Sequence, residues 1–344
     1  MGPIETVPEG SVPKQQSAGQ KQLYTLVTNV NFVQVPVMVK DTEGRRVDGL
    51  LPKDFTVVEN GKKQNMTFFT SDPFELSVAV VIDIGMPDVA VQKVNQTFPA
   101  LVGAFSQYDE VSLYTYSSTV SQVSDYTGSN TKLTAVLNEM KLERGHNNGP
   151  PVLNGPLAPN GPIVNGIPVG SPTTPVYTPP KESHVLNDAI LRAALDLSKR
   201  DRTRRKVIFV ISDGRELGSK ASYSDVLRLL ETQGIQVKAV ALDSAALPVY
   251  NKLSKLHIPG QGYTNLLPRY AYATGGGQVY TEFSKNAIEN AYSDITSEAR
   301  NQYTLGYATR ATASTTYRNI EIRVDRPGLK IYAKDGYYPA PPAR

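Results

Sequence analysis

The stretch Phe74-Glu-Leu-Ser-Val-Ala-Val-Val-Ile-Asp-Ile-Gly-Met-Pro87 decides the fold that the sequence predicts. Its apolar run from Val78 to Ile82 is unbroken, which is typical of a strand buried on both faces of a parallel sheet. The run ends in Asp83, and Gly85 and Pro87 then stop the strand. A carboxylate at the carboxyl end of a central parallel strand lies where open α/β sheets form their binding crevice. The alternative is an exposed loop aspartate that caps the next helix.

A second buried strand, Lys206-Val-Ile-Phe-Val-Ile-Ser-Asp213, also ends in an aspartate. Around these two strands, predicted helices alternate with further strands. This alternation predicts an α/β fold over residues 73–300, a doubly wound and mostly parallel sheet of the Rossmann-like type. The helical spacing covers 91–105, 133–140, 185–197, 223–232, 266–273 and 287–300, and the other strands are expected at 111–116, 120–123, 235–242 and 278–280.

Both ends of the chain have a different pattern, with short strands and turn residues. Because a small isolated sheet is weak, we expect residues 23–72 and 301–338 to pack together as one β-sandwich, into which the α/β domain is inserted. Pro36 inside the first run indicates an edge strand. Residues 1–22 are polar, with scattered Pro and Gly, and are predicted to be a disordered arm.

Composition excludes several classes of protein. The 344-residue chain has a formal charge of +4, and its densest basic cluster, 199–206, directly precedes an apolar strand, so no nucleic-acid partner is expected. The absence of cysteine removes disulfides, thiol nucleophiles and thiolate metal sites. No segment has the roughly 18 apolar residues of a membrane span. No signal peptide is visible at the amino terminus, where Met1-Gly-Pro-Ile-Glu5 could equally replace one.

The segment 145–182 fits neither pattern, because it is crowded with Pro, Gly and Asn. Asn-Gly-Pro recurs at 148–150, 154–156 and 160–162, and apolar residues are interspersed. A long loop inside a compact domain is usually functional or disordered. A loop that binds a partner or another copy of the chain and a passively disordered loop both remain open.

Several short motifs in consistent order now converge. The strand that ends in Asp83, the helix opening Leu186-Asn-Asp-Ala-Ile190 and the strand end Ile211-Ser-Asp-Gly214 resemble a von Willebrand factor A domain, and more narrowly the VWFA-related family abundant in Acidobacteria. The resemblance covers roughly residues 25–338. Its further motifs are Leu50-Leu-Pro-Lys-Asp-Phe55, Val58-Glu-Asn-Gly61, Ala273-Thr-Gly-Gly276, Tyr303-Thr-Leu-Gly-Tyr307, Tyr317-Arg-Asn-Ile320 and Asp335-Gly-Tyr337.

The resemblance implies a metal-ion-dependent adhesion site (MIDAS), in which Asp-x-Ser-x-Ser, a Thr and an Asp bind Mg²⁺ or Ca²⁺ and the partner's carboxylate completes the coordination. Asp83 matches the first ligand and Asp213 the last. Gly85 and Pro87 stand at the two Ser positions and offer no side-chain oxygen. We therefore expect a degenerate site with no cofactor, and weak Mg²⁺ or Ca²⁺ binding by Asp83 and Asp213 is the alternative.

The family's Thr position falls at His184, next to Ser183. Because the loop 145–182 ends there, we expect it to emerge at the same crevice and to cover or replace the metal site as the surface that binds a partner. The residues expected to contact that partner are Gly85, Ser183, His184, Asn154, Asn160 and Ile163.

No catalytic arrangement of residues is visible, so the chain is expected not to be an enzyme. The strongest enzymatic alternative treats Val81-Ile-Asp-Ile-Gly85 as the phosphate loop of an actin-like nucleotide-binding ATPase. Met86-Pro87 disfavours it, since methionine is bulky there and proline has no amide donor. A Walker loop, a His-Glu-x-x-His pair and a Gly-x-Ser-x-Gly elbow are absent from the sequence.

The predicted function is a non-catalytic protein–protein interaction module for adhesion or assembly, which uses the carboxyl-end face of the sheet and the loop 145–182. The alternative is a self-assembling structural subunit of an extracellular or envelope polymer. The resemblance implies an extracytoplasmic location, whether secreted, periplasmic or at the cell surface.

Overall fold

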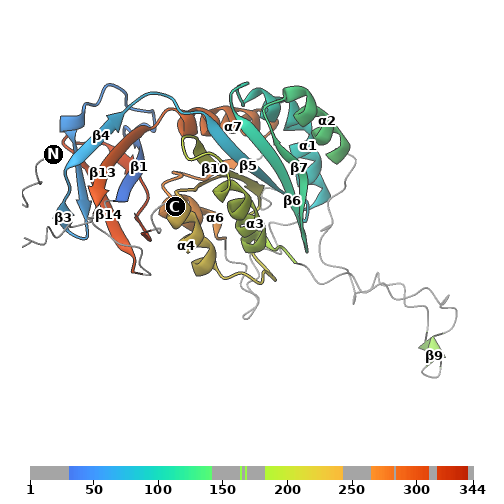
Figure 1. Ribbon diagram of the computed structural model, residues 1–344. Helices are drawn as coiled ribbons and strands as arrows, with labels where there is room; N and C mark the ends of the chain where they lie inside the picture. The colour runs from blue at the N-terminus through green and yellow to red at the C-terminus, as the bar shows by residue number, and fades with distance from the viewer. Residues whose placement is uncertain are drawn as a thin grey trace, which may run out of the picture.

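The computed structural model describes residues 31–141, 183–242, 265–282, 284–309 and 316–339, and the short strands β8 (Ile163–Val164) and β9 (Ile167–Pro168), which pair as a hairpin. The described parts form an α/β unit and a β unit that lie beside each other (Figure 1). None of the described helices is long and apolar enough to cross a membrane.

The α/β unit is built on a six-stranded sheet in the order β12-β11-β10-β5-β6-β7. All neighbouring strands are parallel except β6 and β7, so the predicted fold class, α/β with a mostly parallel sheet, is confirmed. Numbered along the unit and listed from β7, the order is 3-2-1-4-5-6, which is a doubly wound order. The bounds are β5 Leu76–Asp83, β6 Glu110–Tyr116, β7 Val120–Thr127, β10 Arg205–Ser212, β11 Gln236–Leu242 and β12 Tyr280–Glu282.

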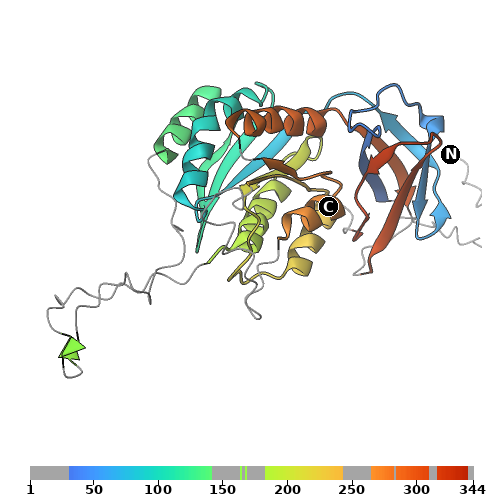
Figure 2. The same cartoon turned by 180° about the vertical axis from the view of Figure 1, so that it is seen from behind.

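Helices cover both faces of this sheet (Figures 1 and 2). On one face α1 (Asp88–Gly103), α2 (Asn130–Met140) and α7 (Lys285–Arg300) share a core with the sheet, and on the other α3 (Leu186–Ser198), α4 (Tyr223–Gln233) and α6 (Leu267–Ala273) do so. The fully buried strand β5 supplies both cores, because alternate side chains of a strand point to opposite faces. Val78, Val80 and Ile82 join the first core, whereas Ala79 and Val81 join the second.

Local sequence fixes where several helices begin and end. Ser129, Ser222 and Ser284 accept a backbone N–H at the start of α2, α4 and α7. Gly234 ends α4 in the left-handed conformation, with φ 64°. The helix α1 continues through Pro99 to its last residue, Gly103.

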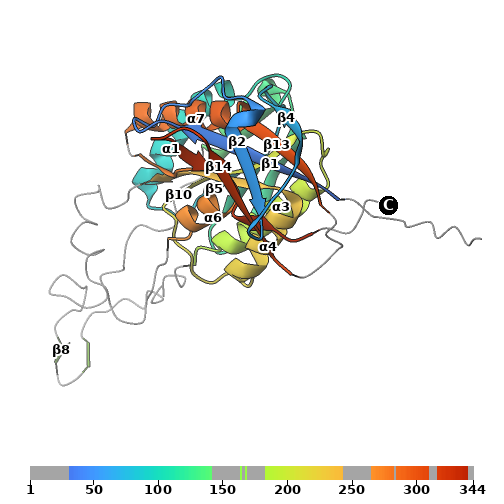
Figure 3. The same ribbon diagram turned by 90° about the vertical axis from the view of Figure 1, so that its left-hand side faces the viewer.

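The β unit combines strands from both ends of the described chain, as Figure 3 shows. Its two four-stranded sheets have the orders β15-β1-β13-β4 and β16-β14-β2-β3, and all of their pairings are antiparallel. The two sheets share one hydrophobic core. The bounds are β1 Asn31–Lys40, η1 Pro52–Asp54, β2 Phe55–Glu59, β3 Lys62–Lys63, β4 Met66–Thr70, β13 Tyr303–Thr309, β14 Arg318–Val324, β15 Lys330–Tyr332 and β16 Gly336–Tyr337.

The prediction that Pro36 marks an edge strand is wrong, because β1 lies between β15 and β13. The strand β15 pairs only with Met38–Lys40 of β1. Among the described residues, Pro36 therefore has a strand partner on one side alone, Thr304 of β13, and the strand tolerates the proline. The domain boundaries drawn from the sequence stay predictions, and the arm 1–22 and most of the loop 145–182 lie outside the described residues.

Buried charged groups join the two units. Glu298 of α7 pairs with Lys40 of β1 and, at 3.1 Å, with Lys238 of β11. Burial opposes ionisation of Glu298, but the two ammonium groups outweigh it and lower the pKa of that carboxyl. Arg205 of β10 reaches across to β13, where Nη2 donates to Thr304 Oγ1 at 2.8 Å. The units are therefore held together by interactions that are costly to break, because separating the units would deprive buried charged groups of partners.

Gly276 is a position where only glycine fits. A Cβ atom there would lie 1.8 Å from the backbone oxygen of Val237. We predict that Gly276→Ala lowers the free energy of unfolding by about 1–3 kcal/mol or more, measured by urea denaturation. In the matched control Gly103→Ala, at the end of α1, the added methyl meets nothing within 4 Å. That variant should be unchanged or up to about 1 kcal/mol more stable, and equal stability of the two variants would contradict the prediction.

Glu231 of α4 carries a pH-dependent part of the stability. Burial raises the pKa of Glu231 to about 7, although Tyr317, whose hydroxyl donates to Glu231 Oε1 at 3.3 Å, counteracts the shift. Between about pH 4.5 and about pH 7 the folded state therefore still holds a proton that the unfolded chain has released. The free energy of unfolding consequently falls as the pH rises through this window.

We expect Glu231→Gln, which cannot titrate, to gain stability relative to the unmodified protein as the pH rises through this window. Urea denaturation of both proteins at pH 5, 6, 7 and 8 measures the difference, in which contributions from titrating groups that do not interact with Glu231 cancel. A difference that does not change with pH would contradict the assignment.

Candidate functional site

The two aspartates predicted to mark the binding crevice do end neighbouring strands. Asp83 is the last residue of β5, Asp213 follows β10 directly, and the parallel register pairs Ile82 with Ile211. The strand order reverses between β5 and β10, which is the switch point where open α/β sheets place their ligands.

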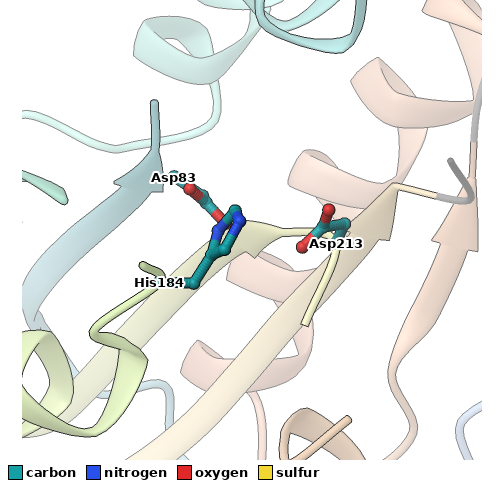
Figure 4. A group of neighbouring side chains, drawn as sticks. All are labelled: Asp83, His184 and Asp213. Carbon is teal, nitrogen blue, oxygen red and sulfur yellow. The ribbon is translucent and has the colours of Figure 1, made fainter. Parts of the chain in front are cut away.

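His184 completes a buried cluster with these aspartates, here called the Asp-His-Asp cluster (Figure 4). One ligand atom from each of Asp83, His184 and Asp213 lies within 4.8 Å of the others, and His184 Nδ1 is 3.4 Å from Asp83 Oδ2. His184 lies just before α3, where its backbone exchanges two hydrogen bonds with Leu217, of 2.8 and 2.9 Å. This bridge ties the segment that leads into α3 to the loop after β10.

The carboxylate of Asp83 is fully buried and surrounded by donors. The Gly85 backbone N–H donates to Oδ1 at 2.8 Å and the Ser212 hydroxyl to Oδ2 at 2.9 Å. Ser212 Oγ in turn accepts from the Tyr116 hydroxyl at 2.7 Å and from Gly214 N–H at 2.9 Å. One hydroxyl therefore joins the ends of β5, β6 and β10.

Asp213 has its own positively charged neighbour. Arg215 donates its backbone N–H to Oδ1 at 3.1 Å, and its Nε lies 3.2 Å from Oδ2. Burial and the negative charge of Asp83 nevertheless raise the pKa of Asp213 to about 6. For His184, burial disfavours the imidazolium, but the hydrogen bond and charge of Asp83 outweigh burial and raise its pKa. Two carboxylates thus share a site with an imidazole and a guanidinium.

The imidazole of His184 fills the space beside Gly85. A Cβ atom at Gly85 would lie 3.2 Å from His184 Cε1 and Nδ1 and 3.1 Å from Asp83 Oδ1. A serine at this position would therefore crowd the ring. Glycine at 85 and histidine at 184 are complementary in shape.

The donor set does not fit a hard divalent cation. Mg²⁺ and Ca²⁺ take six or more oxygen ligands, whereas this site offers two carboxylates, three of whose four oxygens already accept protein donors. As a set, Asp83, His184 and Asp213 offer two oxygens and an imidazole nitrogen, which is a donor combination used by transition metals.

The residues predicted to contact a partner fall into two groups. Gly85 and His184 are buried within the cluster, and the hydroxyl of Ser183 donates to the Leu217 carbonyl oxygen at 3.1 Å. Asn154 and Asn160 lie outside the described residues, as does the side chain of Ile163, which begins β8. A role for any of them in partner binding stays a prediction.

Sequence reasoning missed three residues of the site, Tyr116, Ser212 and Arg215. Ser212 directly precedes Asp213 and Arg215 follows it by two positions, so their closeness to Asp213 in the sequence was a signal from which they could have been predicted. Nothing in the local sequence marked Tyr116, which lies 96 positions from its partner Ser212.

Two further carboxylates support the loop after β10. Asp188 accepts the backbone N–H groups of Lys220 and Ala221, and Glu216 accepts the backbone N–H of Asn187 at 2.8 Å. The start of α3 and the loop after β10 are thereby connected in both directions.

No protein-family model matches the sequence, and no curated protein matches it either. Solved structures with a similar path of the chain include BatB from Bacteroides thetaiotaomicron, a conserved hypothetical protein, with 14% identity over 65% of this chain and 98% of that chain and a TM-score of 0.42. A von Willebrand factor type A protein from Catenulispora acidiphila has 8% identity over 91% of this chain and 63% of its own, with a TM-score of 0.46.

Proximal thread matrix protein 1 from the mussel byssus, in a structure with a zinc-occupied MIDAS motif, has 13% identity over 70% of this chain and 50% of that chain, with a TM-score of 0.42. At TM-scores below 0.5, the fold of the α/β unit is established by its own strand order and not by these alignments. Membership of the acidobacterial family stays a resemblance.

Ser212 is the central connection of the site. We predict that Ser212→Ala lowers the free energy of unfolding by about 1–3 kcal/mol, because it removes the hydrogen-bond partner of the buried Tyr116 hydroxyl and Gly214 N–H and one donor of Asp83. Urea denaturation measures the loss. In the control Ser198→Ala, a half-buried helical hydroxyl that donates to Leu195 O is removed, and a change below about 0.5 kcal/mol is expected. Equal losses would show that the connection at Ser212 is unimportant.

Proposed function

We propose that this protein is a non-catalytic protein-interaction module that binds its partner at the carboxyl-end face of the six-stranded sheet. The observation that carries the proposal is the Asp-His-Asp cluster at the switch point, which fixes three loops on one face. Asp83 and His184 are at most 1% exposed, so these titratable groups support the loops and have no access to a substrate. This burial favours recognition over catalysis.

The exposed rim around the cluster provides the contact surface. Val89 at the start of α1 is 55% exposed although apolar, and Lys220 in the loop after β10 is exposed as well. The loop 145–182, which joins the chain beside Ser183, is proposed as the second part of this surface. An extracytoplasmic location belongs to the same proposal and rests on the resemblance.

A second candidate function, self-assembly as a structural subunit, has support from the β unit. Phe32 is 52% and Phe68 39% exposed, and their rings form an edge-to-face pair with centroids 6.1 Å apart. A Cβ atom at Gly306 would lie 2.4 Å from the Phe32 ring and 2.9 Å from Phe68 Cβ, so both side chains lie against the strand β13. Such an exposed aromatic pair suits a contact with another protein or another copy of the chain.

The tagged chain should retain a protein partner from the envelope fraction of cells that naturally make it. Val89→Asp should abolish retention, because it places a charge on the apolar part of the rim. The variant should still fold, because a negative charge is favourable at the start of a helix. Tyr108→Asp is the matched control, since Tyr108 is 64% exposed near the start of β6 at the opposite edge of the sheet, and it should leave retention unchanged.

Equal behaviour of the two variants would contradict the carboxyl-end face as the binding surface. Recovery of the untagged chain itself, with a multiple of the monomer mass in light scattering, would support self-assembly instead. The same measurement on a chain lacking residues 146–182 separates assembly through the loop from assembly through the β unit.

A further inference from the structure

We propose that His184 and Arg215 together take the place of a divalent cation at the switch point, so that the interaction face is assembled without metal. This inference deepens the proposed function by stating how its face is held. It starts from the mismatch between the donor set and the MIDAS that the resemblance implies.

The first step concerns charge. Two carboxylates lie together in the cluster, and their side chains are 0% and 2% exposed. Buried carboxylates are costly unless donors or opposite charges compensate them. Asp83 has two hydrogen-bond donors and the imidazole of His184, and Asp213 has the guanidinium of Arg215. The protein itself supplies the compensation that a bound cation would otherwise provide.

The second step concerns space. The ring of His184 packs against Gly85, where a side chain would lie 3.2 Å from it. Pro87 is buried and has no hydroxyl group. The histidine and the absence of serine at 85 and 87 therefore belong to one arrangement, in which the imidazole occupies the volume beside Asp83 that metal-ligand oxygens would need.

The third step concerns the loops. A cation would join them through shared coordination, whereas here protein hydrogen bonds join them directly. The His184–Leu217 bridge ties the start of α3 to the loop after β10, and Ser212 ties that loop to Asp83. The face is therefore preorganised, and the resident groups leave no role for a metal in ordering it.

Thermal melting of the full chain, after EDTA treatment and with Mg²⁺, Ca²⁺, Mn²⁺ or Zn²⁺ added alone, tests the inference. We expect no change in Tm with any of the four ions, including Mn²⁺ and Zn²⁺, whose preferred donors the cluster contains, because the Arg215 guanidinium already lies 3.2 Å from Asp213 Oδ2 and would repel a cation there. A site that bound one of them at a hundred times its Kd would raise Tm by about 4 °C. Such a saturable rise, lost in Asp83→Asn, would overturn the proposal.

A gain-of-function variant tests the spatial claim. Gly85→Ser combined with Pro87→Ser and His184→Thr restores the family's hydroxyl groups, and this triple variant should gain a Tm rise with Mg²⁺ or Mn²⁺ that a further Asp83→Asn removes. Gly85→Ser alone is the matched control and should lower Tm without any response to metal, because the serine crowds His184. A folded triple variant that does not respond would overturn the claim that the imidazole occupies the volume that metal-ligand oxygens would need.

If the triple variant does not fold, His184→Thr alone tests the same claim. Removal of the ring opens space beside Asp83, so Mn²⁺ should recover part of the lost Tm, and no recovery would overturn the claim. These melting experiments need no partner. A result against the metal-free arrangement would therefore leave the proposed interaction face in place and show that a metal helps to order it. Failure of the rim variants in the retention experiment would instead reject the face itself.

Discussion

Two carboxylates at the ends of neighbouring buried strands are the constraint on which the rest of the site depends. The parallel pairing of β5 with β10 brings Asp83 and Asp213 to the same edge of the sheet. Side by side and away from water, they require compensation. The Gly85 amide, the Ser212 hydroxyl, the His184 imidazole and the Arg215 guanidinium provide it.

The groups that compensate the two carboxylates come from different segments of the chain. The same interactions that compensate these charges therefore also fix the positions of the loops. Ser212 joins three strand ends, and His184 joins α3 to the loop after β10. Buried polar networks with their members satisfied are rigid and specify one arrangement. A face held in this way loses little conformational entropy when a partner binds, which favours a role in recognition.

A second set of buried charges gives the β unit a defined position. Glu298 between Lys40 and Lys238, and Arg205 on Thr304, connect the two hydrophobic cores of the α/β unit to the separate core of the β unit. Since strands from both ends of the described chain build the β unit, its formation also closes the chain around the α/β unit. The proposed interaction face lies on the α/β sheet, while the exposed pair Phe32 and Phe68 lies on the β unit.

The sequence by itself determined the fold class, the strand and helix order, and the meeting of Asp83 with Asp213, because these follow from local periodicity and from the geometry of parallel strands. It also indicated that hydroxyl ligands are missing at Gly85 and Pro87. Only the tertiary structure decided that His184 packs on Gly85, that Arg215 turns back to Asp213, that Tyr116 reaches Ser212, and that β1 is an inner strand despite Pro36. The physical reason is that most of these contacts join residues far apart in the chain. Sheet register and the packing of whole elements set such contacts, and a local pattern carries no record of them.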